Sequence, residues 1–434
     1  MLLEFTVGNF LSFKDKKTLS LESTSITEHK ESNVVKTGRY DLLKSAVIYG
    51  ANSGGKSNLI KAMSTMRRIV FHSFESSSTK KLDVTPFLLN TETENTPSFF
   101  EVVFLISDIK YRYGFEINNS SIKAEWLFEA QKKVEKPLFI REGDAIEITN
   151  VFSEGENLEE KTRENALFLS VVDQFNGKTA RRIIQWFNDF VTISGLGHER
   201  YKGITFSMLE NKKTKPSMLR FYTELDLGFD DIQIEKEPFN TKDFDNELPE
   251  SIIKQLMTDL DDSFKIEIKT SHKKYDKDNS LVCDVEFDMR NQESSGTNKI
   301  FNISGPIFDV LNDGGVLVVD ELDASLHPLL TLAVTKLFNS TEHNPKNAQL
   351  IFATHDTNLL HYGNYRRDQI YFVEKDNYGA SDLYSLVEYK EDGKTVRKDR
   401  SFERDYIQGR YGAIPFIGNL SNISNNGSKS KNTQ

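Results

Sequence analysis

The stretch that decides the fold is "AVIYGANSGGKSNLIKAM", residues 46–63. Its first four residues, 46–49, are apolar and are typical of a short buried strand. The next eight, from Gly50 to Ser57, follow the P-loop pattern G-x-x-x-x-G-K-[ST]. Apolar residues then recur at helical spacing, at Leu59, Ile60, Met63 and Met66. A glycine-rich loop between a strand and a helix is the setting that a phosphate-binding loop requires.

The residue types of this loop predict a site for ATP and Mg²⁺. Glycines allow backbone N–H groups to surround phosphate oxygens, and the helix N-terminus adds a favourable dipole. Lys56 is expected to reach the β- and γ-phosphates, and Ser57 to bind Mg²⁺. The predicted nucleotide-binding residues of the loop are Gly50, Asn52, Gly54, Gly55, Lys56, Ser57 and Asn58. Many different machines share such a loop, so the loop alone does not identify this one.

Composition narrows the class of protein. The 434 residues are 38% hydrophobic and 28% charged, as in a globular protein with a sizeable core. The net charge of −10 does not attract nucleic acid to the molecule as a whole. Cys283 is the single cysteine, which excludes a disulfide framework and a cysteine-based zinc site within one chain. Without a signal peptide or an apolar run of about 20 residues, we expect a cytoplasmic protein with no membrane contact.

The remaining chain predicts two halves of one ATPase core around an insertion. Alternating segments predict antiparallel strands at 2–7, 18–21, 98–106, 111–118, 123–130 and 145–151. From about residue 164 the spacing becomes helical, with further helices expected at 217–225 and 249–260. We therefore expect an N-terminal ATPase half (1–155), a mostly helical insertion (156–265), a C-terminal ATPase half (266–420) and a disordered tail (421–434).

The second half of the site is "GGVLVVDELDASLHP" (314–328). Val316–Val319 predict a strand buried on both faces, and two carboxylates follow at its C-terminal end, where α/β sheets bind ligands. This is the Walker B arrangement. Asp320 is expected to hold Mg²⁺, and Glu321 to polarise the water that attacks the γ-phosphate.

Two further elements flank this strand. "QLIFATHDTNLL" (349–360) predicts a strand that ends at His355, placed to contact the γ-phosphate as a switch histidine. Upstream, Ser294 and Gly296 lie in a turn before an amphipathic helix, in "NQESSGTNKIFNISGPIFDVL" (291–311). Such a turn is a second anion-binding element, which we name the signature turn (residues 293–297).

The order of P-loop, signature turn, Walker B strand, D-loop and switch histidine resembles ATPase heads of the ABC type, closest to SMC-, RecF- and OLD-like heads. "NFLSFKD" (9–15) and "RSFERDYIQGRYGAIPFIG" (400–418) are similar to a bacterial family of stand-alone ABC-like AAA ATPases in phage-defence loci. That family includes the RloA/AbiL type and the ATPase subunit of PARIS. The resemblance implies an α/β fold: a mixed central sheet with an antiparallel β-subdomain and a mostly helical insertion.

The resemblance also implies how the site works. Two ATPs lie between two subunits, so that Ser294 and Gly296 of one subunit cap the γ-phosphate held by Lys56 and Ser57 of the other. Asp323, in the D-loop "ELDASLHP" (321–328), makes the contact across this interface. The resemblance thus implies a homodimer or higher homo-oligomer that acts as sensor and scaffold in anti-phage defence. The toxic chemistry belongs to a separate effector, often a toprim-type nuclease.

The sequence departs from the ABC pattern in two places. The signature reads E-S-S-G-T instead of L-S-G-G-Q, with Ser295 where a glycine is usual. No glutamine lies between Ser57 and Glu101, and "TPFLLN" (85–90) stands where that Q-loop is expected. Phe10 and Phe13 fit either adenine stacking or the hydrophobic core.

Other functions remain open at this point. A RecF-like repair ATPase would bind duplex DNA through basic residues, for which the candidates are Arg181, Arg182, Lys212, Lys213 and Lys215. A solvated basic loop is the simpler interpretation of these residues, given the net charge. The missing Q-loop glutamine and the long insertion argue against a transporter subunit. A P-loop kinase has no need of a signature turn or a switch histidine.

Overall fold

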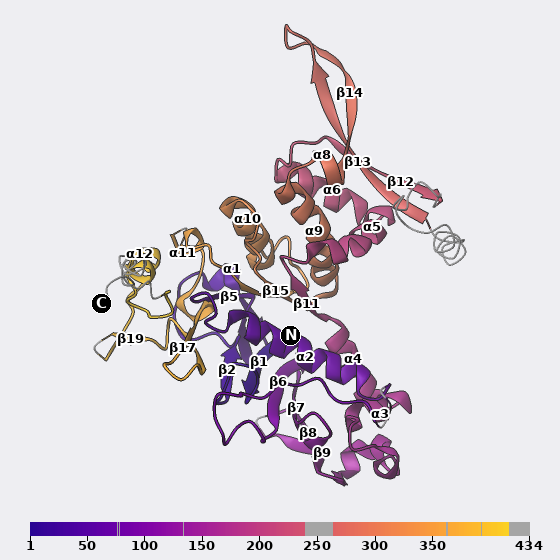
Figure 1. The fold of residues 1–434 in the computed structure, drawn as a ribbon, viewed down its shortest axis with the longest axis vertical. Helices are drawn as coiled ribbons and strands as arrows, with labels where there is room; N and C mark the ends of the chain where they lie inside the picture. Colours follow the sequence, from indigo (N-terminus) through magenta and orange to yellow (C-terminus); the bar gives the residue numbers. More distant parts are fainter. Residues whose placement is uncertain are drawn as a thin grey trace, which may run out of the picture.

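The computed structural model describes the chain except residues 76, 78, 133, 239–263, 362, 392 and 416–434. Two sheets share one helix, α2 (Lys56–His72), which begins at the end of the P-loop. The antiparallel sheet lies at one end of the molecule and a thin hairpin projects from the other, with the central sheet between them (Figure 1).

The central sheet has the strand order β11-β15-β16-β5-β17-β18. Its strands are β5 (Ser45–Tyr49), β11 (Phe190–Ser194), β15 (Val316–Asp320), β16 (Gln349–Ala353), β17 (Ile370–Lys375) and β18 (Ser381–Ser385). All neighbours are parallel except β18, which is antiparallel to β17. The buried strands predicted at 46–49, 316–319 and 349–353 are confirmed. Because β16 lies between β5 and β15, the P-loop, the Walker B carboxylates and His355 all follow carboxyl ends at one edge of the sheet.

The second sheet is antiparallel, in the order β10-β9-β8-β7-β6-β1-β2. Its strands are β1 (Leu2–Gly8), β2 (Lys17–Ser20), β6 (Ser98–Ile106), β7 (Ile109–Ile117), β8 (Ile122–Ala130), β9 (Lys136–Glu142) and β10 (Ala145–Ile148). The strands expected from alternation are confirmed, although β10 ends at Ile148 because a 3-10 turn begins at Asn150. The sequence analysis missed β9. A short hairpin, β3 (Val34–Thr37) and β4 (Tyr40–Leu43), precedes β5.

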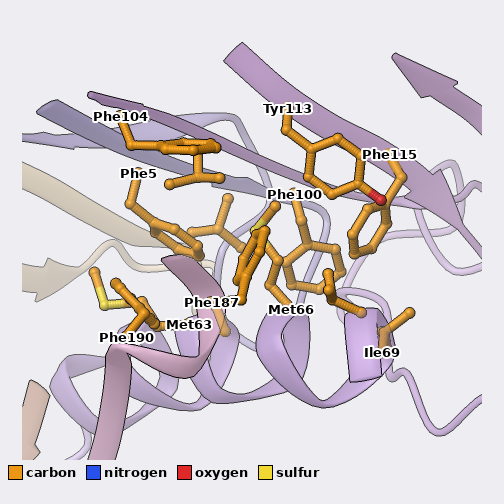
Figure 2. Close-up of a cluster of buried hydrophobic side chains, with 14 of the residues drawn as sticks. Phe5, Met63, Met66, Ile69, Phe100, Phe104, Tyr113, Phe115, Phe187 and Phe190 are labelled. Carbon is orange, nitrogen blue, oxygen red and sulfur yellow. The ribbon is translucent and has the colours of Figure 1, made fainter. Parts of the chain in front are cut away.

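Helix α2 supplies the core between the sheets. Figure 2 shows Met63, Met66 and Ile69 of this helix facing aromatic rings of the antiparallel sheet, among them Phe100 and Phe115. Phe187 and Phe190 complete this cluster from the start of the insertion. The helix that carries Lys56 and Ser57 is therefore fixed along its length by burial of apolar side chains, the largest favourable contribution to folding.

The insertion is less uniformly helical than expected. Its helices are α3 (Phe168–Gln174), α4 (Lys178–Asn188), α5 (Lys202–Glu210) and α6 (Lys215–Glu224). Residues 190–194, however, form β11, which pairs with the Walker B strand β15. Phe190 extends the helical spacing of α4 in sequence, but tertiary pairing makes the residue part of a strand. The helix expected at 249–260 lies outside the described residues.

A separate three-stranded sheet follows the insertion helices. Its strands are β12 (Asp231–Pro238), β13 (Phe264–Tyr275) and β14 (Leu281–Asp288), all antiparallel. The end of the β13–β14 hairpin projects from the molecule (Figure 1). It is followed by α8 (Met289–Gln292) and the long helix α9 (Ser295–Asp313), which packs against α5. Most residues of the hairpin are exposed, which weakens the alternation that would identify its strands from sequence.

The C-terminal segments cover the outer side of the central sheet. Tyr406 stacks on Phe372 of β17 and also contacts Tyr49 of β5, and Tyr411 packs at a tilt against Phe372. The described residues also form α1 (Lys30–Asn33), α10 (Pro328–Asn339), α11 (Asn358–His361), α12 (Phe402–Ile407), β19 (Lys390–Glu391), β20 (Lys394–Thr395) and 3-10 turns at Asn150–Gly155, Glu159–Lys161, His198–Tyr201 and Arg367–Gln369. The tail 421–434 lies outside the described residues. In the part of the chain that is described, no helix combines the length and apolarity needed to cross a bilayer.

Candidate nucleotide-binding site

The P-loop is packed so tightly that its glycines have no room for side chains. A Cβ at Gly50 would lie 2.3 Å from the carbonyl oxygen of Val373, and one at Gly55 2.3 Å from Oγ of Ser381. Gly55 also has a φ of 125°, a conformation that other residues rarely adopt. The loop therefore lies directly against β17 and the start of α2. Asn52, at the tip of the loop, is exposed.

Lys56 is buried against the loop that it terminates. Its Nζ donates hydrogen bonds to the carbonyl oxygens of Gly50 (2.8 Å) and Ala51 (3.3 Å), and the residue is 5% exposed. Burial lowers the pKa of this amine, although Asp320, Glu321 and Asp323 oppose the shift. The ammonium group is thus already inside the curve of the loop, where the phosphates are predicted to bind.

Ser57 and Asp320 meet across the two elements predicted to hold Mg²⁺. The Ser57 hydroxyl donates to Oδ1 of Asp320 at 3.1 Å, from the first turn of α2 to the end of β15. Mg²⁺ commonly takes only one or two protein ligands and completes its octahedron with phosphate oxygens and waters. A hydroxyl beside a carboxylate at the mouth of a phosphate loop has that chemistry, so the residues present fit the ion.

Glu321 has an unusual backbone conformation. Its φ is 53°, in the left-handed region, directly after the strand that positions Asp320. The loop after β11 packs closely against this residue: the N–H of Gly195 donates to the carbonyl of Asp320 (2.7 Å), and a Cβ on Gly195 would lie 2.0 Å from the carbonyl oxygen of Glu321. A strained backbone held by its surroundings is a common feature of functional sites.

Lys299 is a second buried amine at this site, and the sequence analysis did not identify it. From the second turn of α9, its Nζ donates to the carbonyl oxygens of Glu321 (3.0 Å) and Ala324 (2.7 Å), and the residue is fully buried. Burial lowers the pKa of this amine to about 8, against the opposing effects of Asp323 and Glu321. Lys299 therefore joins the helix of the signature turn to the segment that follows the Walker B strand.

Asp323 and His355 lie together after neighbouring strands. Oδ2 of Asp323 accepts a hydrogen bond from the backbone N–H of His355 at 3.1 Å, while its Oδ1 is buried without a hydrogen-bond partner. Desolvation and, next, the Lys56 ammonium group lower the pKa of His355, which favours the neutral imidazole. The D-loop residue is thus bonded within its own chain, and its contact across an interface stays a prediction.

The signature turn is ordered as a helix cap. Oγ of Ser294 accepts from the N–H of Thr297 (3.0 Å), which makes Ser294 the N-cap of the 19-residue helix α9. Ser294 and Ser295 are exposed, and a Cβ on Gly296 would lie 3.0 Å from the carbonyl of Ser325. The turn therefore lies beside its own D-loop. Among the hydrogen bonds of the described residues, none joins the signature turn to the P-loop of the same chain.

Two serines from distant parts of the chain brace the P-loop, and the sequence analysis missed this role. Oγ of Ser381 donates to the carbonyl of Gly54 (2.7 Å) and bonds to Oγ of Ser12 (2.7 Å). Asn58, predicted to bind nucleotide, donates its side-chain amide to the same Ser12 hydroxyl at 2.8 Å. Ser12 lies in the "NFLSFKD" segment, so the motif quoted above was informative, but no local pattern indicates Ser381.

The phenylalanines of that segment belong to the core. Phe10 is 4% exposed and packs edge-on against Phe100 at 5.1 Å, and Phe13 is fully buried. Adenine stacking by either ring is therefore excluded in this conformation, since neither has a free face. "TPFLLN" (85–90) is anchored on the same segment: Phe87 donates its N–H to the side chain of Asn9 at 2.9 Å.

The comparison with known proteins agrees with this geometry. A family model described as "AAA domain, putative AbiEii toxin, Type IV TA system" matches residues 45–361, well over half of the chain. The match begins at the first residue of β5 and ends just beyond the switch histidine, so it includes both halves of the site. No curated protein matches the chain.

Proposed function

Since the chain belongs to this family of AAA domains, a P-loop ATPase family, we propose that it is a Mg²⁺-dependent ATPase of the ABC type, whose nucleotides lie between two copies of the chain. The observation that carries the proposal is the pairing of a complete P-loop site with a signature turn that packs on its own D-loop instead of its own P-loop. The strand order, with β16 between β5 and β15 and an antiparallel sheet beside them, supports the ABC type.

The residues of one chain can bind the triphosphate and prepare its attack by water. The backbone N–H groups of the loop and the Lys56 ammonium group neutralise phosphate charge, with Gly50, Gly54 and Gly55 providing the close approach. Ser57 and Asp320 would hold Mg²⁺, which would supply positive charge next to the triphosphate. Glu321 orients and deprotonates the attacking water, and neutral His355 donates a hydrogen bond to the γ-phosphate.

The second copy supplies the cap. Ser294 and the free N–H groups of the first turn of α9 are placed to meet a γ-phosphate from outside their own chain. Asp323 would reorganise to contact the partner, which gives its buried, unbonded Oδ1 a role. Association then depends on ATP, and hydrolysis releases it.

The family description places AAA domains of this kind in toxin–antitoxin and abortive-infection systems. We propose accordingly that the assembly is an ATP-driven sensor or scaffold of anti-phage defence in the cytoplasm. The RloA/AbiL and PARIS likeness of its terminal motifs supports a separate effector, such as a toprim-type nuclease. The purified chain alone should hydrolyse ATP slowly and leave DNA intact.

Mixing two inactive variants tests the shared site. Lys56→Ala removes the P-loop amine, and Ser295→Asp places a carboxylate at the exposed first residue of α9, where it repels a γ-phosphate but favours the helix. Each variant alone should be inactive. An equimolar mixture should recover about a quarter of the wild-type rate, because half of the dimers are mixed and carry one intact composite site.

The matched control for the cap variant is Ser295→Asn, which is neutral and of similar size and should retain activity. No recovery on mixing, together with full activity of Ser295→Asp, would refute capping by a second copy. Recovery that requires both variants in one solution would support it.

A second candidate is a RecF-like ATPase that binds duplex DNA. It is supported by the placement of three exposed lysines close together in sequence: Lys212 and Lys213 on the link between α5 and α6, and Lys215 at the first residue of α6. ATP-stimulated binding of duplex DNA that weakens steeply with salt would favour this candidate.

A further inference from the structure

Glu293, the first residue of the signature turn, is held by the strand that leads into the projecting hairpin. Its side chain is 8% exposed, and its Oε1 lies 2.7 Å from Nε2 of His272 on β13. The hydroxyl of Thr270, two residues earlier on the same strand and fully buried, donates to the same oxygen. One carboxylate oxygen of Glu293 thus contacts two side chains that lie on the same face of β13.

The other strand of the hairpin reaches the same turn through the backbone. β14 ends at Asp288, whose side chain caps α8 by accepting from Asn291 N–H at 2.7 Å. Asn298 of α9 then donates its amide to the carbonyl oxygens of Met289 (2.8 Å) and Ser294 (3.1 Å). The short helix, the turn and α9 are therefore bonded into one unit at the base of the hairpin.

Among the described residues, the outer end of the hairpin has fewer contacts with the rest of the chain, one of which is the ion pair of Lys273 with Asp230 at 3.2 Å. β12 pairs with β13 only as far as Ser271, so beyond that residue β13 and β14 form a two-stranded ribbon. Tyr275, Leu281 and Val282 on this ribbon are each more than half exposed. The pairing of β13 with β14 connects this ribbon to its base, where Thr270 and His272 contact Glu293.

We propose that the β13–β14 hairpin is a lever that positions the signature turn, with Thr270 and His272 as positioning residues that hold the ATP-capping pose through Glu293. The inference rests on the proposed function, because it assumes that the turn caps a nucleotide of a second copy. It adds a regulatory input to that site: contact with the hairpin changes ATP-dependent association without changing the P-loop.

The substitutions that test the lever preserve its packing. Thr270→Val replaces the hydroxyl with a methyl group, and His272→Phe keeps the ring that contacts Phe287 at 4.4 Å between centroids. The double variant leaves Glu293 a buried carboxylate without these partners, which favours a different pose of the turn. Lys274→Ala, an exposed residue of the same strand, is the matched control.

All variants are made in the Glu321→Gln chain, in which hydrolysis is blocked, and two quantities are measured with ATP and Mg²⁺. One is the affinity of a fluorescent ATP analogue at protein concentrations below association, and the other is the dissociation constant of the assembly by sedimentation. The double variant should bind the analogue within twofold of the parent but associate about tenfold or more weakly, since hydrogen bonds to a charged group are being lost. Replacing Val by Ser at position 270 of the double variant restores the hydroxyl, and this Thr270→Ser, His272→Phe chain should regain part of the association. Lys274→Ala should match the parent.

Each other outcome overturns the lever. Equal association of the double variant and the parent refutes it while leaving the ATP sandwich intact. A parent that binds the analogue but never associates refutes the proposed function and the lever with it. If the double variant loses analogue binding as well, the single variant His272→Phe is measured in the same way. If that single variant binds the analogue more weakly but associates like the parent, the lever is refuted.

Discussion

The P-loop and the signature turn are both built from serine and glycine, yet the structure holds them in different ways. The P-loop is braced by neighbouring residues: Ser381 bonds to the carbonyl of Gly54 and is bonded in turn to Ser12, and Val373 of β17 packs against Gly50 and Gly54. The signature turn exposes Ser294 and Ser295 and is positioned from outside, by the base of a projecting hairpin. The comparison suggests that nucleotide binding is fixed in each copy, whereas capping is the adjustable step.

The largest effect on the rate of ATP hydrolysis should come from Glu321, which acts in the chemical step and not in binding. Glu321→Gln should lower the rate of ATP hydrolysis by about 10² or more, the usual contribution of a general base, while ATP binding persists. Steady-state phosphate release and sedimentation with ATP measure the two quantities, and the ATP-bound assembly should accumulate. Glu342→Gln, at an exposed position after α10, is the matched control. Hydrolysis at the wild-type rate would show that Glu321 is not the base.

The brace of the P-loop should affect binding rather than association. Ser381→Ala removes the hydroxyl that bonds to Gly54 and Ser12, leaving a buried carbonyl without that partner. Such a loss costs about 1–3 kcal/mol, so the affinity for ATP should fall about tenfold. Isothermal titration measures this affinity. If Ser381→Ala instead weakened association and left ATP binding unchanged, the distinction between a fixed P-loop and an adjustable signature turn would be wrong.

The surroundings of the P-loop could be predicted from sequence far better than the surroundings of the signature turn. The P-loop and the Walker B strand are contiguous motifs, so Lys56, Ser57 and Asp320 could be placed by local spacing alone. Lys299 was missed because a lysine in an amphipathic helix normally lies on the solvent face, and only the fold buries this one. Thr270, His272 and Ser381 act at long range in sequence, and their partners are decided by strand pairing that no local pattern encodes.

Lys299 links the helix of the signature turn to the segment after the Walker B strand, and it should make the rate of ATP hydrolysis depend on pH. Its pKa of about 8 lies below the ordinary lysine value, because burial penalises the charged form. As pH rises through about 8, the amine loses a proton and with it the positive charge that strengthens its hydrogen bonds to the carbonyls of Glu321 and Ala324. The rate at saturating ATP should therefore fall by a few-fold between pH 7 and 9. Lys299→Arg, which keeps its charge, should not show that fall, and an identical profile in both chains would exclude Lys299 as its source.

The same group affects stability in the opposite direction. Between the folded pKa of about 8 and the ordinary value of 10.5, the unfolded chain binds more protons at this position than the folded chain. The contribution of Lys299 to the free energy of unfolding should therefore rise with pH across this interval. Denaturant unfolding of the wild type and of Lys299→Met at pH 8 and pH 10 measures it, and the difference between the two chains should change in favour of the wild type.

The smallest effect is expected at the exposed lysines around the link between α5 and α6, on the same side of the site as the signature turn's helix α9. Lys212 and Lys213 lie on the exposed link after α5, and Lys215 is the first residue of α6. Helix α5 packs on α9, the helix that the signature turn begins. If only the hairpin positions that turn, replacing all three lysines by alanine should change ATP-dependent association by less than about twofold, as for exposed residues generally. A larger change that disappears at high salt would mean that an electrostatic surface next to α9 also acts on the cap. In that case the adjustable half would have two inputs, and the one through the lysines would suit the phosphates of a nucleic acid better than a protein partner.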